Sequence, residues 1–370
     1  MKIKNDGNDV KHVSLKLMIC LTYADRPLVA ICKGLFDAGV ELFVVCDPRA
    51  EKFDVLKEYG FRLESVVVKS RLDFAAVRQY KKLIGLFDPD VIYAPANKTL
   101  SVTLLASRGK SIKIVGYRGT IGHISRLDPA SWMTYLNPRL NKIFCVSHAV
   151  EDYLHNKMHI KDSKLITIYK GHDVQWYQNA EKIDLQQFSV PSDAFVVAFV
   201  GNIRPVKGVD VLLRSISQIP PESHLHFLFV GEVRDPSIKQ LLNDKEVQSR
   251  TTFVGYRADA LNFIKSSDVF VMPSVEREGL PRAVFEAMAL RKPVVVSNVG
   301  GMKEQIVDGK CGLIVEPKDE VALVSAFLKL ENEPALCSKY GNAGYKRLEE
   351  YFNIQQTISK FYDQLKLIVK

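Results

Sequence analysis

The chain has 370 residues, of which 47% are hydrophobic, and a net charge of +9. At roughly 150 residues per domain, this length predicts two domains with cores of ordinary size. No apolar run approaches the roughly 18 residues that a membrane-spanning helix needs. The apolar segment Leu15 to Ala24 is interrupted by Lys16 and lacks a small-residue cleavage site, so we predict a buried first strand there and not a signal peptide.

The cysteines and the charge distribution indicate the cellular compartment of the protein and the kind of partner it binds. The six cysteines form no Cys-x-x-Cys pair and no Cys/His cluster with zinc spacing, which fits free thiols in a reducing cytoplasm. Residues 1–180 hold 27 Lys and Arg against 18 Asp and Glu, and the remaining residues hold 24 of each. The basic half indicates an acidic partner, which is anionic lipid headgroups, a phosphorylated glycan or nucleic acid, or else simply a solvated basic surface. Because no nucleic-acid-binding motif occurs, we expect no nucleic-acid partner.

Short apolar runs alternate with segments of helical period in the first half, which indicates parallel β-α-β units. Gly39 fits the position that ends the first helix. We predict strands at residues 15–21, 42–45, 65–68, 91–93, 113–117, 142–146 and 165–168, and helices at residues 28–38, 74–86 and 149–158.

A second series of the same kind begins at Ala194. Strands are predicted at residues 195–200, 225–230, 252–254, 269–272, 294–297 and 312–315. Helices are predicted at residues 209–217, 236–242, 258–266, 282–289, 303–308 and 320–330.

The two series predict an α/β fold of two doubly wound, Rossmann-like domains that face a central cleft, since ligands bind beyond the carboxyl ends of strands in open α/β sheets and between domains. The polar stretch 173–192 is the expected linker, with domains at residues 1–178 and 179–350. Residues 351–370 are predicted to form a terminal amphipathic helix. Its apolar positions are Ile354, Ile358, Phe361, Tyr362 and Leu365.

The first motif with chemical content follows the strand at 195–200. A loop with Gly201, Arg204 and Lys207 leads into the helix that begins at Val209. Backbone N–H groups at a helix start favour an anion, and Arg and Lys add side-chain charge for phosphate oxygens. A diphosphate fits these donors, although a solvated loop is the alternative interpretation.

The second motif is Met272-Pro-Ser-Val-Glu-Arg-Glu-Gly-Leu-Pro-Arg-Ala-Val-Phe-Glu-Ala-Met-Ala289. A buried strand runs into a polar loop, then Gly279, then a helix. Glu278 precedes this helix, and Glu286 lies on it within an otherwise apolar face. A carboxylate there needs a partner because burying one alone is costly. A pair of ribose hydroxyls is one such partner; the alternative is a carboxylate that caps a neighbouring turn.

Here the chain resembles the group 1 (family 4) retaining glycosyltransferases with the two-domain GT-B fold. Their signature of two Glu separated by seven residues corresponds to Glu278-GLPRAVF-Glu286. The family's following helix, strand and Gly-Gly-x-x-Glu turn correspond to Ala287-Met-Ala289, Pro293–Ser297 and Gly300-Gly-Met-Lys-Glu304. The resemblance is dense over residues 195–317, and it implies that the terminal helix crosses back to the first domain.

The resemblance implies a role for each matching residue on the donor side. Arg204 and Lys207 would hold the diphosphate of a UDP- or GDP-sugar and stabilise its growing charge, and Glu286 would bind the ribose hydroxyls. Glu278 would contact the transferred sugar. Supporting positions around the sugar, phosphate and base would be Gly201, Tyr256, Arg257, Gly279, Leu280 and Pro281.

The first half departs from the family pattern. The loop Thr22–Pro27 has no glycine where many members carry a Gly-Gly pair, and Arg26 would offer charge there instead. His123 matches the position where members often present a His near the reacting sugar, for proton handling or for hydrogen bonding to a sugar hydroxyl. Arg118 and Arg126 flank it and are candidates for an anionic acceptor. A structural role is the alternative for each of them.

We therefore expect a retaining, metal-independent hexosyltransferase that uses no cofactor. The one Asp-x-Asp pair, Asp88-Pro-Asp90, precedes a strand and so lies at the end of the sheet away from the cleft. The expected acceptor is a glycan or lipid-linked glycan of bacterial envelope polysaccharide, such as lipopolysaccharide, capsule or exopolysaccharide. The alternatives are another GT-B nucleotide-sugar enzyme, such as a sugar-phosphate synthase or epimerase, and a non-catalytic glycan- or lipid-binding relative.

The helical segment 74–87 combines Arg78, Lys81 and Lys82 with apolar residues. This pattern is typical of a helix that lies on an anionic membrane, or of a core helix with a basic outer face. We expect a cytoplasmic protein with peripheral contact at the inner face of the cell membrane.

Overall fold

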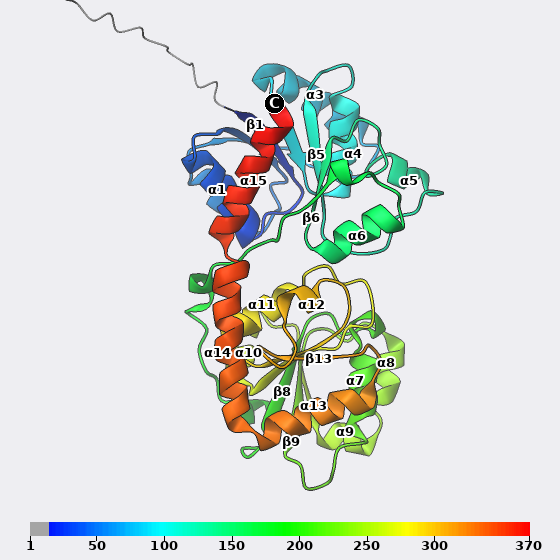
Figure 1. The fold of residues 1–370 in the computed structure, drawn as a ribbon, viewed down its shortest axis with the longest axis vertical. Helices are drawn as coiled ribbons and strands as arrows, with labels where there is room; N and C mark the ends of the chain where they lie inside the picture. The colour runs from blue at the N-terminus through cyan, green and yellow to red at the C-terminus, as the bar shows by residue number, and fades with distance from the viewer. Residues whose placement is uncertain (1–14) are drawn as a thin grey trace, which may run out of the picture. The chain divides into compact units, whose positions relative to one another are not determined.

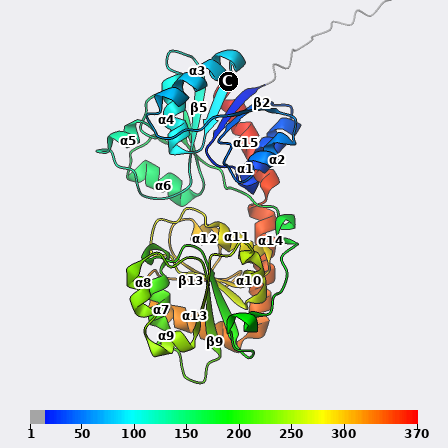
Figure 2. The ribbon, with the colours of Figure 1, turned by 180° about the vertical axis from the view of Figure 1, so that it is seen from behind.

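The computed structural model describes residues 15–370. Residues 1–14, which the predicted first domain includes, lie outside the described residues. Strands and helices alternate along the chain, as Figure 1 and the view from behind in Figure 2 show. The strands form a seven-stranded sheet in the order β3-β2-β1-β4-β5-β6-β7 and a six-stranded sheet in the order β10-β9-β8-β11-β12-β13. The predicted pair of doubly wound sheets is thereby confirmed.

Elements of the first sheet follow the predicted alternation closely. The strands are β1 (Lys16–Leu21), β2 (Glu41–Cys46), β3 (Arg62–Ser65), β4 (Val91–Ala94), β5 (Lys113–Arg118), β6 (Lys142–Cys145) and β7 (Leu165–Thr167). The helices are α1 (Arg26–Asp37), α2 (Phe53–Lys57), α3 (Phe74–Phe87), α4 (Asn97–Ala106), α5 (Pro129–Trp132) and α6 (His148–Asn156). Short 3-10 turns are η1 (Asp162–Lys164), η2 (Val174–Tyr177) and η3 (Leu185–Phe188).

The second sheet begins with β8 (Phe195–Val200). Its other strands are β9 (Leu225–Val230), β10 (Thr251–Gly255), β11 (Val269–Met272), β12 (Val294–Ser297) and β13 (Leu313–Val315). The helical segments are η4 (Pro205–Lys207), α7 (Val209–Ile216), α8 (Pro236–Leu241), α9 (Lys245–Ser249), α10 (Ala260–Ser266), α11 (Arg282–Ala289), α12 (Met302–Gln305), α13 (Glu320–Asn332) and α14 (Pro334–Tyr351). The terminal helix is α15 (Ile354–Val369).

The chain divides into two compact units. The first contains the described residues 15–117, 126–143 and 358–370, and the second contains residues 118–125 and 144–357. These ranges differ from the predicted limits at residues 178 and 350. The terminal helix packs on the first unit, where Ile358 lies against Gly34 of α1 and the ring of Phe361 meets Tyr93 of β4 edge-on at 4.9 Å between centroids.

Local sequence explains where the helices begin. Asp25, Asp73 and Ser147 are N-caps whose side chains accept from the backbone N–H groups of Leu28, Ala76 and Val150, which satisfies donors that a helix start leaves unpaired. Gly39 has a φ of +83° just beyond α1, as predicted for the residue that ends this helix.

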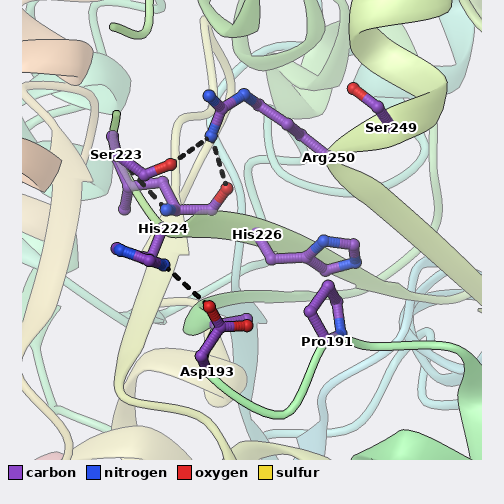
Figure 3. Close-up of a pocket in the computed structure, with 9 residues that line it drawn as sticks. Pro191, Asp193, Ser223, His224, His226, Ser249 and Arg250 are labelled. Atoms are coloured by element: carbon purple, nitrogen blue, oxygen red, sulfur yellow. Dashed lines mark hydrogen bonds and ion pairs between the residues drawn. The ribbon is translucent and has the colours of Figure 1, made fainter. Parts of the chain in front are cut away.

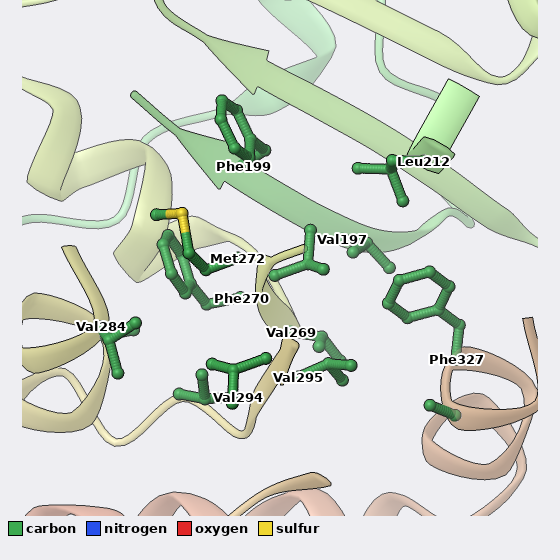
Figure 4. Packing of buried hydrophobic residues seen from close by; sticks show 14 of the residues in the cluster. Val197, Phe199, Leu212, Val269, Phe270, Met272, Val284, Val294, Val295 and Phe327 are labelled. Atoms are coloured by element: carbon green, nitrogen blue, oxygen red, sulfur yellow. The ribbon is translucent and has the colours of Figure 1, made fainter. Parts of the chain in front are cut away.

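The second unit is built around one large apolar core. Figure 4 shows side chains of β8, β11 and β12 packed against residues of α7, α11 and α13, with Phe199, Phe270 and Phe327 among them. Helices cover both faces of this sheet, with α7, α8 and α9 on one side and α10, α11 and α14 on the other (Figures 1 and 2). The carboxyl ends of its parallel strands are consequently the open edge at which a ligand site can form.

Candidate active site

Three loops leave the carboxyl ends of the strands of the six-stranded sheet and meet there. They follow β8, β11 and β12 and comprise residues 201–208, 273–281 and 298–301. Gly208 has a φ of +69°, and a Cβ on it would lie 1.8 Å from the carbonyl oxygen of Pro273. Only glycine permits this approach, so the loop after β8 is pressed against the loop after β11.

Lys207 and Glu278 form an ion pair at this contact. The Nζ of Lys207 lies 2.5 Å from Oε1 of Glu278, and the Oγ of Ser274 donates to the same oxygen at 2.7 Å. Glu278 is only 8% exposed. The lysine has three N–H donors and uses one on Glu278, so the pair retains donors and acceptor sites that a bound molecule can engage.

Three stretches of backbone are stacked beside Glu278. A Cβ on Gly300 would lie 1.9 Å from the carbonyl oxygen of Glu278, and one on Gly301 would lie 1.9 Å from that of Gly279. A Cβ on Gly279 would in turn lie 2.0 Å from the carbonyl oxygen of Gly119. Close backbone packing at the site therefore requires glycine at Gly279, Gly300 and Gly301.

Glu286 is the fifth of the eight residues of α11, and its side chain is 13% exposed. The Nε of Arg282, one turn earlier, approaches its Oε1 at 3.0 Å. The structure thus places a cation beside this carboxylate, and the contact with ribose hydroxyls stays a prediction. Pro281 is the N-cap of α11, and its carbonyl oxygen accepts from Nε2 of Gln305 at 3.1 Å.

The other predicted donor residues have varied surroundings. Arg204 is exposed and is the N-cap of η4, and Gly201 directly follows β8. Tyr256 is 75% exposed. Arg257 forms a two-pronged pair with Asp259, both N–O distances being 2.9 Å, and its guanidinium lies over the ring of Phe263. Two nitrogens of this guanidinium are therefore already occupied by Asp259.

His123 lies in the loop formed by residues 118–125, which belongs to the second unit. It is exposed, has a φ of +57°, and its Nε2 lies 3.4 Å from Nη1 of Arg277. Arg277 also has a positive φ, +64°, and packs against Gly122. Left-handed backbone at two non-glycine residues is costly and clusters at functional sites. Sequence reasoning missed Arg277, whose only signal was its place directly before Glu278.

The predicted acceptor arginines differ in exposure. Arg118 is 5% exposed, and its guanidinium donates to the carbonyl oxygens of Thr120, at 2.8 Å, and Gly122. This arginine shapes the loop that carries His123. Arg126 and Arg26 are exposed, and Arg26 is the first residue of α1.

Within residues 15–370, no group of three or more His, Cys, Asp or Glu side chains is arranged to hold a metal ion. The Asp-x-Asp pair lies at the amino edge of the first sheet, where Oδ2 of Asp90 accepts from the backbone N–H of Lys16 at 2.8 Å. No helix of the described chain is long and apolar enough to span a membrane.

A separate pocket of about 260 Å³ lies at the amino ends of β8 and β9 (Figure 3). Asp193 and His224 form an exposed pair at 3.1 Å, and Arg250 donates to four backbone carbonyl groups nearby. Burial and the charge of Arg250 lower the pKa of His226 to about 4. The pocket is at the opposite edge of the sheet from Glu278, and its charged groups are already paired.

Two doubly wound sheets, the second with a basic loop after β8 and two glutamates around the start of α11, place the protein in the class with the GT-B fold. Comparison with known sequences gives the family directly. Residues 181–347 match the family described as glycosyl transferases group 1, and residues 26–176 match glycosyltransferase family 4. The chain belongs to the group 1 glycosyltransferases.

Individual relatives support this assignment. The chain is 30% identical over 327 residues to the capsular polysaccharide biosynthesis glycosyltransferase CapM of Staphylococcus aureus, covering 81% of this chain and 84% of that protein. It is 25% identical over 383 residues to UDP-Gal:alpha-D-GlcNAc-diphosphoundecaprenol alpha-1,3-galactosyltransferase of Escherichia coli, covering 98% of each. The crystal structure of a glycosyltransferase from Rickettsia africae has the same fold, with a TM-score of 0.82 at 19% identity over 97% of this chain and 100% of that one.

Proposed function

We propose that this glycosyltransferase moves a hexosyl-type sugar from a UDP- or GDP-sugar to a glycan or lipid-linked acceptor, with retention of configuration at the anomeric carbon. The observation that carries the proposal is the pair of Lys207 and Glu278, held 2.5 Å apart at the carboxyl edge of the six-stranded sheet. Glu286 lies on the helix that starts directly after this loop.

The donor fits these groups in a simple order. Arg204 and Lys207 bind the diphosphate, Glu286 accepts from the ribose hydroxyls, and Glu278 accepts from a hydroxyl of the sugar. As the bond between the anomeric carbon and the phosphate oxygen breaks, negative charge grows on the β-phosphate. Fixed positive groups aimed at such growing charge usually make the largest contribution to catalysis. This chemistry uses only side chains and backbone N–H groups, so we propose that no metal is needed.

The acceptor class is proposed from the relatives. One acts in capsular polysaccharide biosynthesis and another on a diphosphoundecaprenol-linked sugar. We infer a role in bacterial envelope polysaccharide synthesis, with His123, Arg26, Arg118 and Arg126 on the acceptor side. Arg118 acts there through the loop that it holds, because its guanidinium donates to two carbonyl oxygens of that loop.

A membrane surface is the proposed location of the acceptor. Helix α3 exposes Phe74 (71%) and Leu86 (61%) on its outward face, together with Arg78, Lys81 and Lys82. Exposed apolar side chains among cations suit the boundary of an anionic bilayer, where the apolar side chains enter the interface and the cations bind headgroups. We propose that this face contacts the inner leaflet.

A donor screen followed by product analysis tests the proposal. Thermal shift against UDP-glucose, UDP-galactose, UDP-N-acetylglucosamine and GDP-mannose identifies the donor, since a ligand present at 100 times its Kd stabilises a protein by about 2.7 kcal/mol. Transfer of the labelled sugar to a lipid-linked acceptor is then followed by NMR of the product's anomeric proton. An inverted product contradicts retention, and full transfer by Glu286→Ala contradicts the assigned donor site.

A further inference from the structure

Glu304 follows the Gly300-Gly301 turn and reaches a distant part of the second unit. Its Oε2 accepts from the backbone N–H of His148 at 2.9 Å, and its Oε1 accepts from that of Ala149 at 2.9 Å. The hydroxyl of Tyr169 donates to Oε2 at 3.0 Å. His148 and Ala149 open helix α6, where backbone donors lack helical partners and negative charge is favourable.

The short helix α12 that carries Glu304 is held from behind as well. The guanidinium of Arg347 donates to the carbonyl oxygens of Glu304 and Gln305, at 2.7 and 2.8 Å. Gln305 is fully buried and donates to the carbonyl oxygen of Pro281 at 3.1 Å. These bonds tie α12 to the start of α11, the helix that carries Glu286.

The Gly300-Gly301 turn, which precedes α12, contacts the backbone of the candidate site directly, with no side chain between the two. Gly300 and Gly301 lie directly against the carbonyl groups of Glu278 and Gly279. The same Cβ position on Gly301 is also 2.8 Å from Cβ of Ser147, the N-cap of α6. A displacement of α12 therefore displaces the backbone that orients Glu278.

We propose that Glu304 is a positioning residue for sugar transfer. By holding the first turn of α6, it fixes the Gly300-Gly301 turn, and through that turn it sets the position of Glu278 and of the backbone at Gly279. The inference rests on the proposed function of this site. It assigns Glu304 to the transfer step and leaves nucleotide binding to Arg204, Lys207 and Glu286.

The first experiment separates transfer from binding. With the donor found in the screen, Glu304→Ala is expected to lower kcat about 10- to 100-fold, the order expected when a reacting group is misplaced by about an ångström. The Kd for UDP or GDP, measured by calorimetry, should rise by a smaller factor than kcat falls, because Glu304 reaches the proposed diphosphate contact only indirectly, through Glu278 and its pair with Lys207. Glu304→Gln keeps one accepting oxygen and should lose less activity. Lys303→Gln, on the exposed side of the same short helix, is the matched control.

A second pair of variants tests the hydrogen bond from the backbone of His148 alone. Pro is well tolerated at the first helical position after an extended N-cap, and Ser147 has φ −153° and ψ 160°. His148→Pro therefore removes the N–H donor while the helix start remains favourable, and His148→Ala removes only the imidazole. We expect a lower kcat for His148→Pro than for His148→Ala. Equal kcat values would overturn the proposal.

The outcomes also distinguish this inference from the proposed function. If the wild-type protein transfers sugar and Glu304→Ala has an unchanged kcat per folded molecule, Glu304 has no positioning role. If the wild-type protein transfers no sugar, the proposed function fails, and hydrogen exchange still tests the contact. Faster exchange of the backbone N–H groups of residues 275–280 and 282 in Glu304→Ala than in Lys303→Gln supports the link, and identical exchange refutes it.

Discussion

Lys207 and Glu278 lie 71 residues apart in the chain, and their side chains meet at 2.5 Å. Each comes from a loop at the carboxyl edge of the same sheet, and the loops are pressed together where Gly208 meets the carbonyl group of Pro273. Both side chains are largely buried, with 20% and 11% exposed. The pair thus links the proposed diphosphate contact to the proposed sugar contact, so a change at one residue should be felt at the other.

Replacement of Lys207 by Ala is expected to impair both stability and transfer. Glu278 would remain buried with only Ser274 donating to Oε1, and an under-paired buried group costs about 1–3 kcal/mol. Loss of a positive group at the leaving phosphate should lower kcat about 100- to 1,000-fold. Urea unfolding and steady-state kinetics measure the two effects. Lys245→Ala, on exposed α9, is the control, and a Lys207→Ala enzyme with a near-normal kcat would remove Lys207 from the transfer step.

Gly301 provides a prediction that depends on packing alone. Its φ is −79°, so Ala strains no backbone angle there, but the added Cβ would lie 1.9 Å from the carbonyl oxygen of Gly279. Forced overpacking of this kind costs about 1–3 kcal/mol. We expect Gly301→Ala to destabilise the protein and to lower kcat, measured by urea unfolding and sugar transfer.

Gly85 on α3 is the matched control for that variant. A Cβ at Gly85 would meet nothing within 4 Å, and its φ is not positive. Replacing Gly by Ala inside a helix stabilises by about 0.5–1 kcal/mol. Gly85→Ala should therefore raise the free energy of unfolding while Gly301→Ala lowers it. Equal changes in the free energy of unfolding of both variants would mean that the Gly300-Gly301 turn accommodates the added Cβ without loss of stability.

The alternation of strands and helices was predictable because short buried strands and amphipathic helices carry opposite periodicities. Several helices escaped prediction, and for two of them, α4 and α14, the sequence shows a physical reason. Helix α4 is buried almost all round, with Thr99, Ser101 and Thr103 in its interior-facing surface, so its sequence has no polar stripe. Helix α14 contains Gly341, which weakens the helical signal but lets the helix approach the carbonyl group of Arg291. The predicted strand at 65–68 is wrong by three residues, since β3 spans Arg62–Ser65.

The candidate site was only partly readable from sequence. The two glutamates and the basic loop after β8 occur in recognisable order along the chain, so their residues could be named in advance. The pairing of Lys207 with Glu278, the contact of Arg277 with His123 and the reach of Glu304 to α6 span 71, 154 and 156 residues. Such contacts depend on how the loops meet in three dimensions, which periodicity does not encode.

His226 gives a pH dependence of stability with a definite sign. Burial, followed by the charge of Arg250, lowers its pKa to about 4 in the folded protein, whereas the pKa in the unfolded chain is about 6.5. Between these values the unfolded chain binds the extra proton, so this group reduces stability as the pH falls from about 6.5 to 4, by at most about 1.4 kcal/mol per pH unit. Above pH 6.5 it has no such effect.

Comparing variants isolates this contribution from the carboxylates that titrate in the same range. His226→Gln cannot take up the proton, so its free energy of unfolding should fall less between pH 7 and pH 5 than that of the wild-type protein. Urea unfolding at three pH values makes the comparison, and parallel curves for the two proteins would show that folding does not lower the pKa of His226.

Helix α3 provides the test of membrane contact. Each cation near an anionic surface contributes about 1 kcal/mol, so replacing Lys81 and Lys82 by Gln should weaken binding to vesicles of phosphatidylglycerol and phosphatidylcholine about tenfold or more. Replacing Phe74 by Ser should weaken it further, because its ring is 71% exposed and free to enter the interface.

The control is the double variant Lys245→Gln/Lys329→Gln, which changes the net charge equally on exposed helices of the second unit. If both double variants lose the same affinity in sedimentation, attraction depends on net charge alone and α3 is not the contact face. If only the α3 variants lose affinity while transfer to a water-soluble acceptor is unchanged, α3 brings the enzyme to its lipid-linked acceptor and takes no part in the chemistry.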